Sequence, residues 1–144
     1  MAVPIGLVFD CTDPKRLGAF WIDALGYIER PPPSGYDTWE AYDADHGLTP
    51  EEQDAGYPIA DPDGVGPTIF FQRVPESKVV KNRVHVDVKV GGGVALPFEE
   101  RVRRIEAGVE PLVARGATFL RRNEDPEDYF IVLQDPEGNE FCLV

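Results

Sequence analysis

A strict alternation of apolar and other residues marks the segment Asn82–Val90. Alternation at period two predicts a β-strand with one face in an apolar core. The opposite face then carries His85, Asp87 and Lys89, because successive side chains of a strand point to opposite sides. The pattern therefore predicts a strand that brings an imidazole and a carboxylate to one face, two residues apart.

Two segments show the three-and-four spacing of apolar residues that predicts an amphipathic helix. The first runs from Pro14 to about Leu25 and ends at Gly26, a residue type that often terminates helices. The second spans Phe98–Arg115, and Pro111 within it predicts a kink near Gly108.

Short apolar runs bounded by turn residues predict the remaining strands, at 5–10, 27–30, 57–60, 67–74, 117–121, 129–134 and 139–144. The order is therefore strand, helix and three strands, twice over. The halves also resemble each other: Asp61-Pro-Asp-Gly precedes Phe71-Gln-Arg-Val, and Asp135-Pro-Glu-Gly precedes Phe141-Cys-Leu-Val. We predict an α+β fold with a diverged repeat, module 1 at about 1–76 and module 2 at about 82–144.

A long irregular segment at about 31–56 interrupts module 1 after three consecutive prolines. Short helical turns are expected within it at Thr38–Asp45 and Thr49–Asp54. A segment of this length is either a lid or site wall, or a surface insertion packed by Trp39 and Tyr42. The sequence leaves both interpretations open.

The composition limits the function classes. A chain of 144 residues is one domain of ordinary size, and its formal net charge of -12 disfavours nucleic acid and anionic membranes as partners. Two cysteines with no signal peptide predict no disulfide framework. No apolar run approaches a membrane span. We expect a cytoplasmic protein.

Three stretches resemble the vicinal oxygen chelate superfamily, which includes glyoxalase I, bleomycin- and fosfomycin-resistance proteins and extradiol dioxygenases. They are Asp13-Pro-x-x-Leu-x-x-Phe-Trp-x-x-Ala-Leu-Gly26, Asn82-Arg-Val-His-Val-Asp87 and Asp135-Pro-Glu-Gly-Asn-Glu-Phe-Cys142. Asp61-Pro-Asp-Gly-Val-Gly-Pro67 and Phe71-Gln-Arg-Val-Pro-Glu76 are most similar to glyoxalase-like domain proteins. The resemblance implies a single glyoxalase-like domain over 1–144, with two βαβββ modules that form a half-open curled sheet around a cleft, and a homodimer.

The resemblance also implies where a metal site would lie, because metal enzymes of the superfamily place ligands on the first and last strands of each module. The matching positions are His85, Gln72 and Cys142, whereas the first strand of module 1 offers about Gly6, which has no side chain. Glutamate is usual where Gln72 and Cys142 stand. This incomplete set favours a site without a cofactor. The alternative is a divalent metal ion at His85, Gln72 and Cys142, or with Asp87 completing the set.

Candidate catalytic residues are His85 and Glu140. A partly desolvated carboxyl at Glu140 would have a raised pKa and act as a base. The alternatives are a histidine bonded to its neighbours and a glutamate in a salt bridge. Candidate ligand-binding residues are Gln72, Asp87, Phe70, Trp39 and Cys142.

Two functions fit these residues. The first is a lyase, isomerase or oxygenase that acts on an oxygenated metabolite, and the second is a non-catalytic protein that binds or sequesters a small molecule. A structural or partner-binding module without a cleft is a third hypothesis. Lys78, Lys81 and Arg83 would either draw an anionic substrate or form a solvated linker. Glyoxalase I activity itself is not expected.

Overall fold

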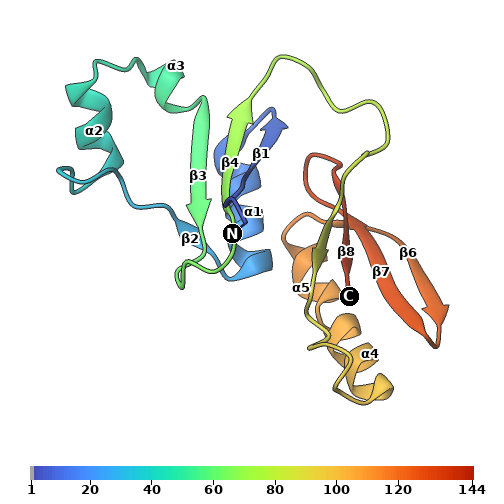
Figure 1. The fold of residues 1–144 in the computed structure, drawn as a ribbon. Helices are drawn as coiled ribbons and strands as arrows, with labels where there is room; N and C mark the ends of the chain where they lie inside the picture. The colour runs from blue at the N-terminus through green and yellow to red at the C-terminus, as the bar shows by residue number, and fades with distance from the viewer. Residues whose placement is uncertain (1) are drawn as a thin grey trace. The chain divides into compact units, whose positions relative to one another are not determined.

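The computed structural model describes residues 2–144, and the chain divides into two compact units, 1–77 and 78–144. Each unit holds one open four-stranded sheet (Figure 1). The element order confirms the predicted α+β fold of two βαβββ modules. None of the helices formed by residues 2–144 is both long and apolar enough to cross a membrane.

The first unit contains a sheet in the order β1-β4-β3-β2, in which β1 and β4 are parallel and the other pairs antiparallel. Its elements are β1 (Gly6–Cys11), α1 (Pro14–Leu25), β2 (Ile28–Glu29), α2 (Trp39–Asp45), α3 (Pro50–Gln53), β3 (Gly56–Ala60) and β4 (Thr68–Arg73).

The helix α1 covers one face of this first sheet. It begins where the Asp13 carboxylate accepts the Arg16 N–H, and it ends at Gly26 with a φ of 69°. Its buried residues include Leu17 and Trp21, and the Trp21 ring lies 5.4 Å from the Phe9 ring. The core of the first unit therefore lies between α1 and the sheet.

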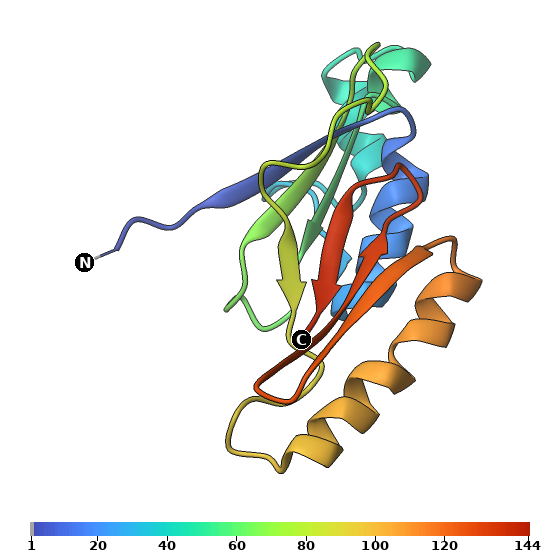
Figure 2. The same ribbon diagram turned by 90° about the vertical axis from the view of Figure 1, so that its right-hand side faces the viewer.

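The second unit repeats this arrangement with a sheet in the order β5-β8-β7-β6, in which β5 and β8 are parallel. Figure 2 shows α4 and α5 along one face of this sheet. The elements are β5 (Val86–Val88), α4 (Phe98–Ala107), α5 (Val109–Ala114), β6 (Thr118–Asp125), β7 (Asp128–Gln134) and β8 (Glu140–Leu143). The break between α4 and α5 falls at Gly108, as predicted.

The prediction of a strand over Asn82–Val90 was wrong in its extent. Only Val86–Val88 forms a strand, and Val84, expected in the core, is 80% exposed. The side chain of Asn82 explains the short strand, because its amide donates to the Val84 carbonyl and its oxygen accepts the Glu140 N–H. The Asn82 side chain therefore occupies the Glu140 N–H, which a longer β5 would bind with its backbone.

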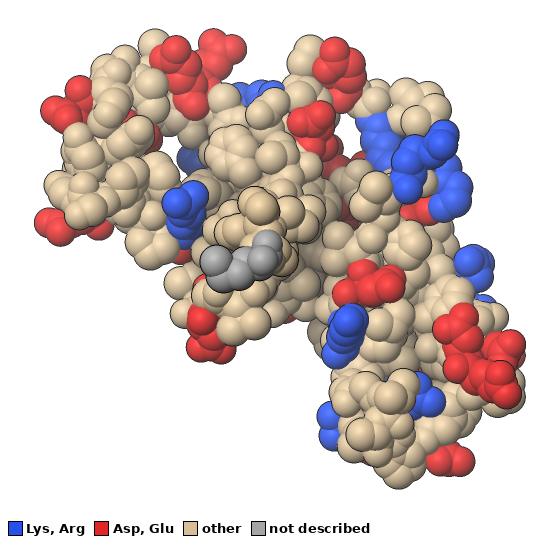
Figure 3. Space-filling model, viewed as in Figure 1, with Lys and Arg blue, Asp and Glu red and all other residues tan. Residues whose placement is uncertain are grey.

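The segment 31–56 forms α2 and α3 close to the expected positions. The Trp39 indole donates to the Arg30 carbonyl at 2.7 Å, and its ring lies 5.6 Å from that of Tyr42. This packing fits an insertion held by Trp39 and Tyr42. The segment contains seven acidic residues and no lysine or arginine, and Figure 3 shows acidic side chains over α2 and α3.

Both units contain the same turn before their last strand. Asp61 accepts the N–H groups of Asp63, Val65 and Gly66, and Asp135 accepts those of Glu137 and Asn139. Each turn closes on a glycine with positive φ, Gly64 and Gly138. The Asp135 side chain also binds the Asn139 amide. The sequence repeat is therefore a structural repeat, but Asp135 is buried and Asp61 is only half-buried.

The difference in burial predicts unequal costs for the two turns. We expect Asp135→Ala to lower the free energy of unfolding by about 2–3 kcal/mol, because it removes a buried carboxylate that binds two part-buried N–H groups and the Asn139 amide. We expect a smaller loss for Asp61→Ala, where water replaces the carboxylate. Urea unfolding of both variants measures the difference, and equal losses would contradict this account.

Candidate functional site

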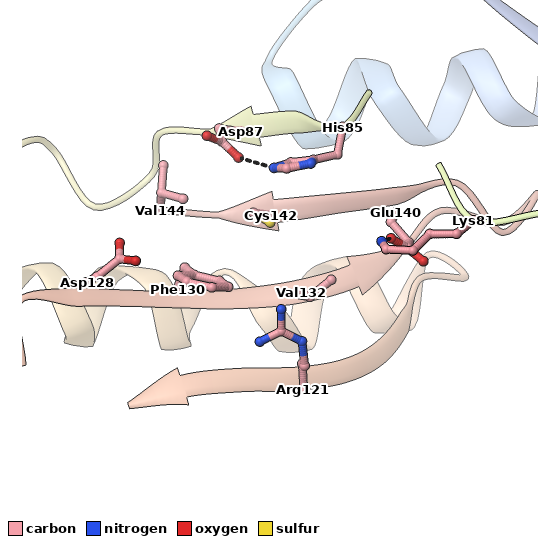
Figure 4. A pocket seen from close by; sticks show the side chains of 10 residues that line it. All are labelled: Lys81, His85, Asp87, Arg121, Asp128, Phe130, Val132, Glu140, Cys142 and Val144. Carbon is pink, nitrogen blue, oxygen red and sulfur yellow. Dashed lines mark hydrogen bonds and ion pairs between the residues drawn. The ribbon is translucent and has the colours of Figure 1, made fainter. Parts of the chain in front are cut away.

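A cleft of about 290 Å³ lies on the second sheet, formed by residues of the second unit alone. Alternation along β8 explains its lining: Phe141 and Leu143 are fully buried, so Glu140 and Cys142 point to the opposite face. On β7, Ile131 and Leu133 are likewise buried. Phe130 and Val132, which alternate with them, line the cleft (Figure 4).

The strand register places one row of side chains directly across the sheet. Asp87 on β5 pairs with Cys142 on β8, Cys142 with Val132 on β7, and Val132 with Arg121 on β6. Directly paired residues share a face. The row therefore runs from a carboxylate through a thiol and an apolar residue to a guanidinium.

His85, Asp87 and Cys142 gather at one side of the cleft. The His85 Nε2 and the Asp87 Oδ1 are 3.3 Å apart, and one ligand atom from each residue lies within 4.8 Å of the others. The side chains of His85 and Asp87 are about half exposed, whereas Cys142 is buried. An imidazole nitrogen, a carboxylate oxygen and a sulfur therefore converge at the solvent-facing side of the sheet.

The thiol of Cys142 is neutral at pH 7. Burial is the largest cause that raises the pKa of this thiol, and the negative charge of Asp87 raises it further. The guanidinium of Arg121 opposes this shift. Cys142 is therefore a poor nucleophile in the free protein. Binding of a cation beside Asp87 would favour the thiolate and release a proton.

Glu140 differs from its expected state. Its carboxylate accepts a hydrogen bond from the Lys81 ammonium, and this bond holds the pKa of the carboxyl below its usual range. The expectation of a raised pKa was wrong, because a nearby cation outweighs the partial burial. Glu140 is thus ionised but a weaker base than an ordinary carboxylate, and the ion-pair alternative holds.

Of the other predicted site residues, Gln72, Phe70 and Trp39 belong to the first unit. Gln72 and Phe70 lie on the exposed side of β4, and Trp39 lies in α2. The structure therefore brings together His85, Asp87, Glu140 and Cys142 from the predicted set.

The strand register also corrects the position in module 1 that corresponds to His85. Asp10 pairs with Gln72 as Asp87 pairs with Cys142, so the position two residues before Asp10 is Val8. The sequence analysis placed it at about Gly6, two residues too early. The correction leaves the conclusion unchanged, because valine also offers no donor atom.

Sequence reasoning missed several residues that line the cleft, namely Arg121, Asp128, Phe130, Val132 and Val144. For two of them the signal was the alternation itself, because Phe130 and Val132 on β7 flank the buried Ile131. Arg121 and Arg122 are neighbours on β6, so they point to opposite faces. Arg122 pairs with Glu106 on α4, and Arg121 lines the cleft.

The comparisons with known proteins agree with this fold. The model of the family described as glyoxalase-like domain matches residues 6–144. No curated protein matches the chain. A solved variant of the fosfomycin resistance protein FosX from Listeria monocytogenes, complexed with Mn(II) and 1S,2S-dihydroxypropylphosphonic acid, is similar in fold. It is 12% identical, covers 99% of this chain and 91% of its own, and has a TM-score of 0.64.

Two further solved structures show the same fold. A possible glyoxalase from Bacillus cereus is 14% identical over 100% of this chain and 99% of its own, with a TM-score of 0.61. A glyoxalase/bleomycin resistance protein/dioxygenase family enzyme from Burkholderia phytofirmans PsJN is 18% identical over 95% and 93%, with a TM-score of 0.58. The family match spans nearly the whole sequence and both repeated modules, and the chain therefore belongs to the glyoxalase-like domain family.

Proposed function

We propose that this protein binds a small oxygenated metabolite in the cleft of the second sheet and acts on it as a lyase, isomerase or oxygenase. The convergence of His85, Asp87 and Cys142 carries the proposal. An imidazole held by a carboxylate at the edge of an apolar floor is suited to proton transfer. The Mn(II) and phosphonic acid bound by the FosX variant support a small-molecule role for this fold.

The three donors fit a divalent metal ion of borderline softness. Nitrogen, oxygen and sulfur donors suit Zn²⁺, Co²⁺ or Fe²⁺ better than Mg²⁺ or Ca²⁺, and three protein ligands leave a position for substrate. His85, Asp87 and Cys142 would hold the ion, with Asp87 taking the place first assigned to Gln72. When bound, the ion would polarise an oxygen of the substrate.

Without a metal, His85 itself would carry the proton transfer. Its Nε2 faces the Asp87 carboxylate at 3.3 Å, an arrangement in which Nε2 carries the proton. Nδ1 is then the free acceptor, and Asp87 fixes the ring and stabilises the charged imidazolium. Glu140 would position a substrate hydroxyl rather than take its proton, because Lys81 keeps its pKa low.

A non-catalytic binding protein is the second candidate. It is favoured by the weak donors in module 1, where Val8 and Gln72 stand at the corresponding positions, and by the neutral thiol of Cys142. A ligand that raises the melting temperature but is recovered unchanged after prolonged incubation would favour this function over turnover.

The metal form of the proposal predicts cobalt binding with a thiolate signature. We expect one Co²⁺ per chain and a sulfur-to-cobalt absorption band in the near ultraviolet, with affinity rising with pH as the Cys142 thiol gives up its proton. His85→Ala and Cys142→Ala should each lose the band. His46→Ala, which removes the other histidine, should keep it.

Failure of wild-type protein to bind Co²⁺ would remove the metal form and leave acid–base chemistry or binding. A band that survives in Cys142→Ala would also contradict the assignment, because it would have to come from Cys11, the second cysteine. Thermal unfolding of each variant controls for loss of fold.

The pair formed by Lys81 and Glu140 predicts a pH-dependent contribution to stability. A carboxyl whose pKa is lowered in the folded state stabilises the fold at pH values above its unfolded-state pKa. This contribution is lost as the pH falls through the folded-state pKa. Lys81→Met should therefore raise the pKa of Glu140 in NMR titrations and reduce stability at pH 7 but not in acid. Lys89→Met is the matched control, and an unshifted Glu140 would contradict the pairing.

For the assembly we propose a homodimer, on the resemblance to the superfamily. Exposed apolar side chains on the sheet face of the first unit, Val8 and Phe70, are suited to an association surface. Light scattering should give twice the chain mass of 16.0 kDa, and Val8→Asp should shift the population toward monomer. Only monomer in the wild type would refute this.

A further inference from the structure

We propose that Arg121 and Phe130 form a carboxylate-binding subsite on the floor of the cleft, so that the molecule bound there is a small organic carboxylate with an apolar body. The inference rests on the proposed function, because it assigns the substrate class of the same cleft. It is carried by the absence of an ion pair at Arg121, by its contact with the Phe130 ring and by its place in the strand register.

The first observation is the absence of an acidic partner for Arg121. Three other arginines of the second unit are paired: Arg103 and Arg104 bind Glu100, and Arg122 binds Glu106. Within residues 2–144, Arg121 forms no ion pair, although the chain has a net charge of -12. A guanidinium that points into a cleft and forms no ion pair there is available to an anionic ligand.

The second observation is the support of the guanidinium by an aromatic ring. The Arg121 guanidinium carbon lies 5.4 Å from the centroid of the Phe130 ring. Figure 4 shows the guanidinium extended from β6 toward Val132, in the middle of the cleft. Contact with the ring restrains the side chain and leaves the N–H groups at its edge free for the two oxygens of a carboxylate.

The remaining lining selects the kind of anion. Asp87, Asp128 and Glu140 also line the cleft, and only Glu140 is bonded to a lysine. A dianionic phosphate would meet more repulsion from these carboxylates than a monoanionic carboxylate. Phe130 and Val132 give the floor an apolar surface, so a carboxylate on a hydrocarbon or aryl body fits better than a bare inorganic ion.

The strand register determines where the two ends of the bound small molecule would lie. Arg121 and Asp87 stand at opposite ends of a row that crosses four strands, so their Cα atoms are roughly 14 Å apart. The long Arg121 side chain spans part of this distance. A small molecule held by its carboxylate at Arg121 therefore presents its other oxygen atoms to His85, Asp87 and Cys142.

The test uses benzoate as the probe, with benzamide as its uncharged analogue and phenylphosphonate as the dianion. Titrations followed by two-dimensional NMR on the full chain would map the resonances that move. We expect benzoate to shift the signals of Arg121, Phe130 and Val132, and to bind about tenfold more tightly than either analogue.

Arg121→Gln should weaken benzoate binding about tenfold, and Arg121→Lys, which keeps the charge but loses the planar fork, should lie between. Arg103→Gln makes the same change of charge on α4, away from the cleft, and should bind benzoate as the wild type does. The subsite would be overturned if benzoate shifted protein resonances but not those of Arg121 and Phe130, or if benzamide bound as tightly as benzoate.

Cobalt binding separates this inference from the proposed function. Arg121→Gln should keep the cobalt band because Arg121 is not a metal ligand. A wild type that binds cobalt but not benzoate overturns the subsite and leaves the metal site standing. A wild type that binds benzoate at Arg121 without cobalt supports the subsite and removes the metal form of the function.

Discussion

The one-sided burial of the second sheet is the constraint on which the site depends. Helices α4 and α5 cover one face, and Phe141 and Leu143 on β8 are fully buried there. Since side chains alternate along a strand, the burial of these two residues places Cys142 on the other face. A slip of one residue would turn Glu140 and Cys142 toward the helices and move two large apolar side chains to the cleft face. The packing of the core thus fixes the chemistry of the cleft.

The same alternation explains why much of the architecture was predictable from sequence. Local signals were sufficient for α1, which begins after Asp13 and ends at Gly26, and for the break at Gly108. The Asp-Pro-x-Gly turns were also recognisable, because their geometry depends on residues within the turn. These features require no knowledge of distant parts of the chain.

The parts that failed depend on partners far away in sequence. The short length of β5 follows from the Asn82 side chain, which binds the backbone of Glu140 in place of a longer strand. The lowered pKa of Glu140 follows from Lys81, and the importance of Arg121 follows from its place opposite Val132. A pattern along one strand shows which face a residue occupies but not which charge it meets there.

The short strand β5 has a further consequence for how the site is assembled during folding. Strands β6 and β7 are neighbours in the chain and pair through a tight hairpin, whereas β5 pairs in parallel with β8, at the far end of the unit. Such a contact closes a long loop and forms late, and three paired residues hold it weakly. His85 and Asp87 therefore belong to the part of the unit that opens most readily, whereas Arg121 and Phe130 belong to a hairpin that forms locally. The Arg121 side of the cleft thus persists with the hairpin, whereas the His85 side exists only while β5 stays paired with β8.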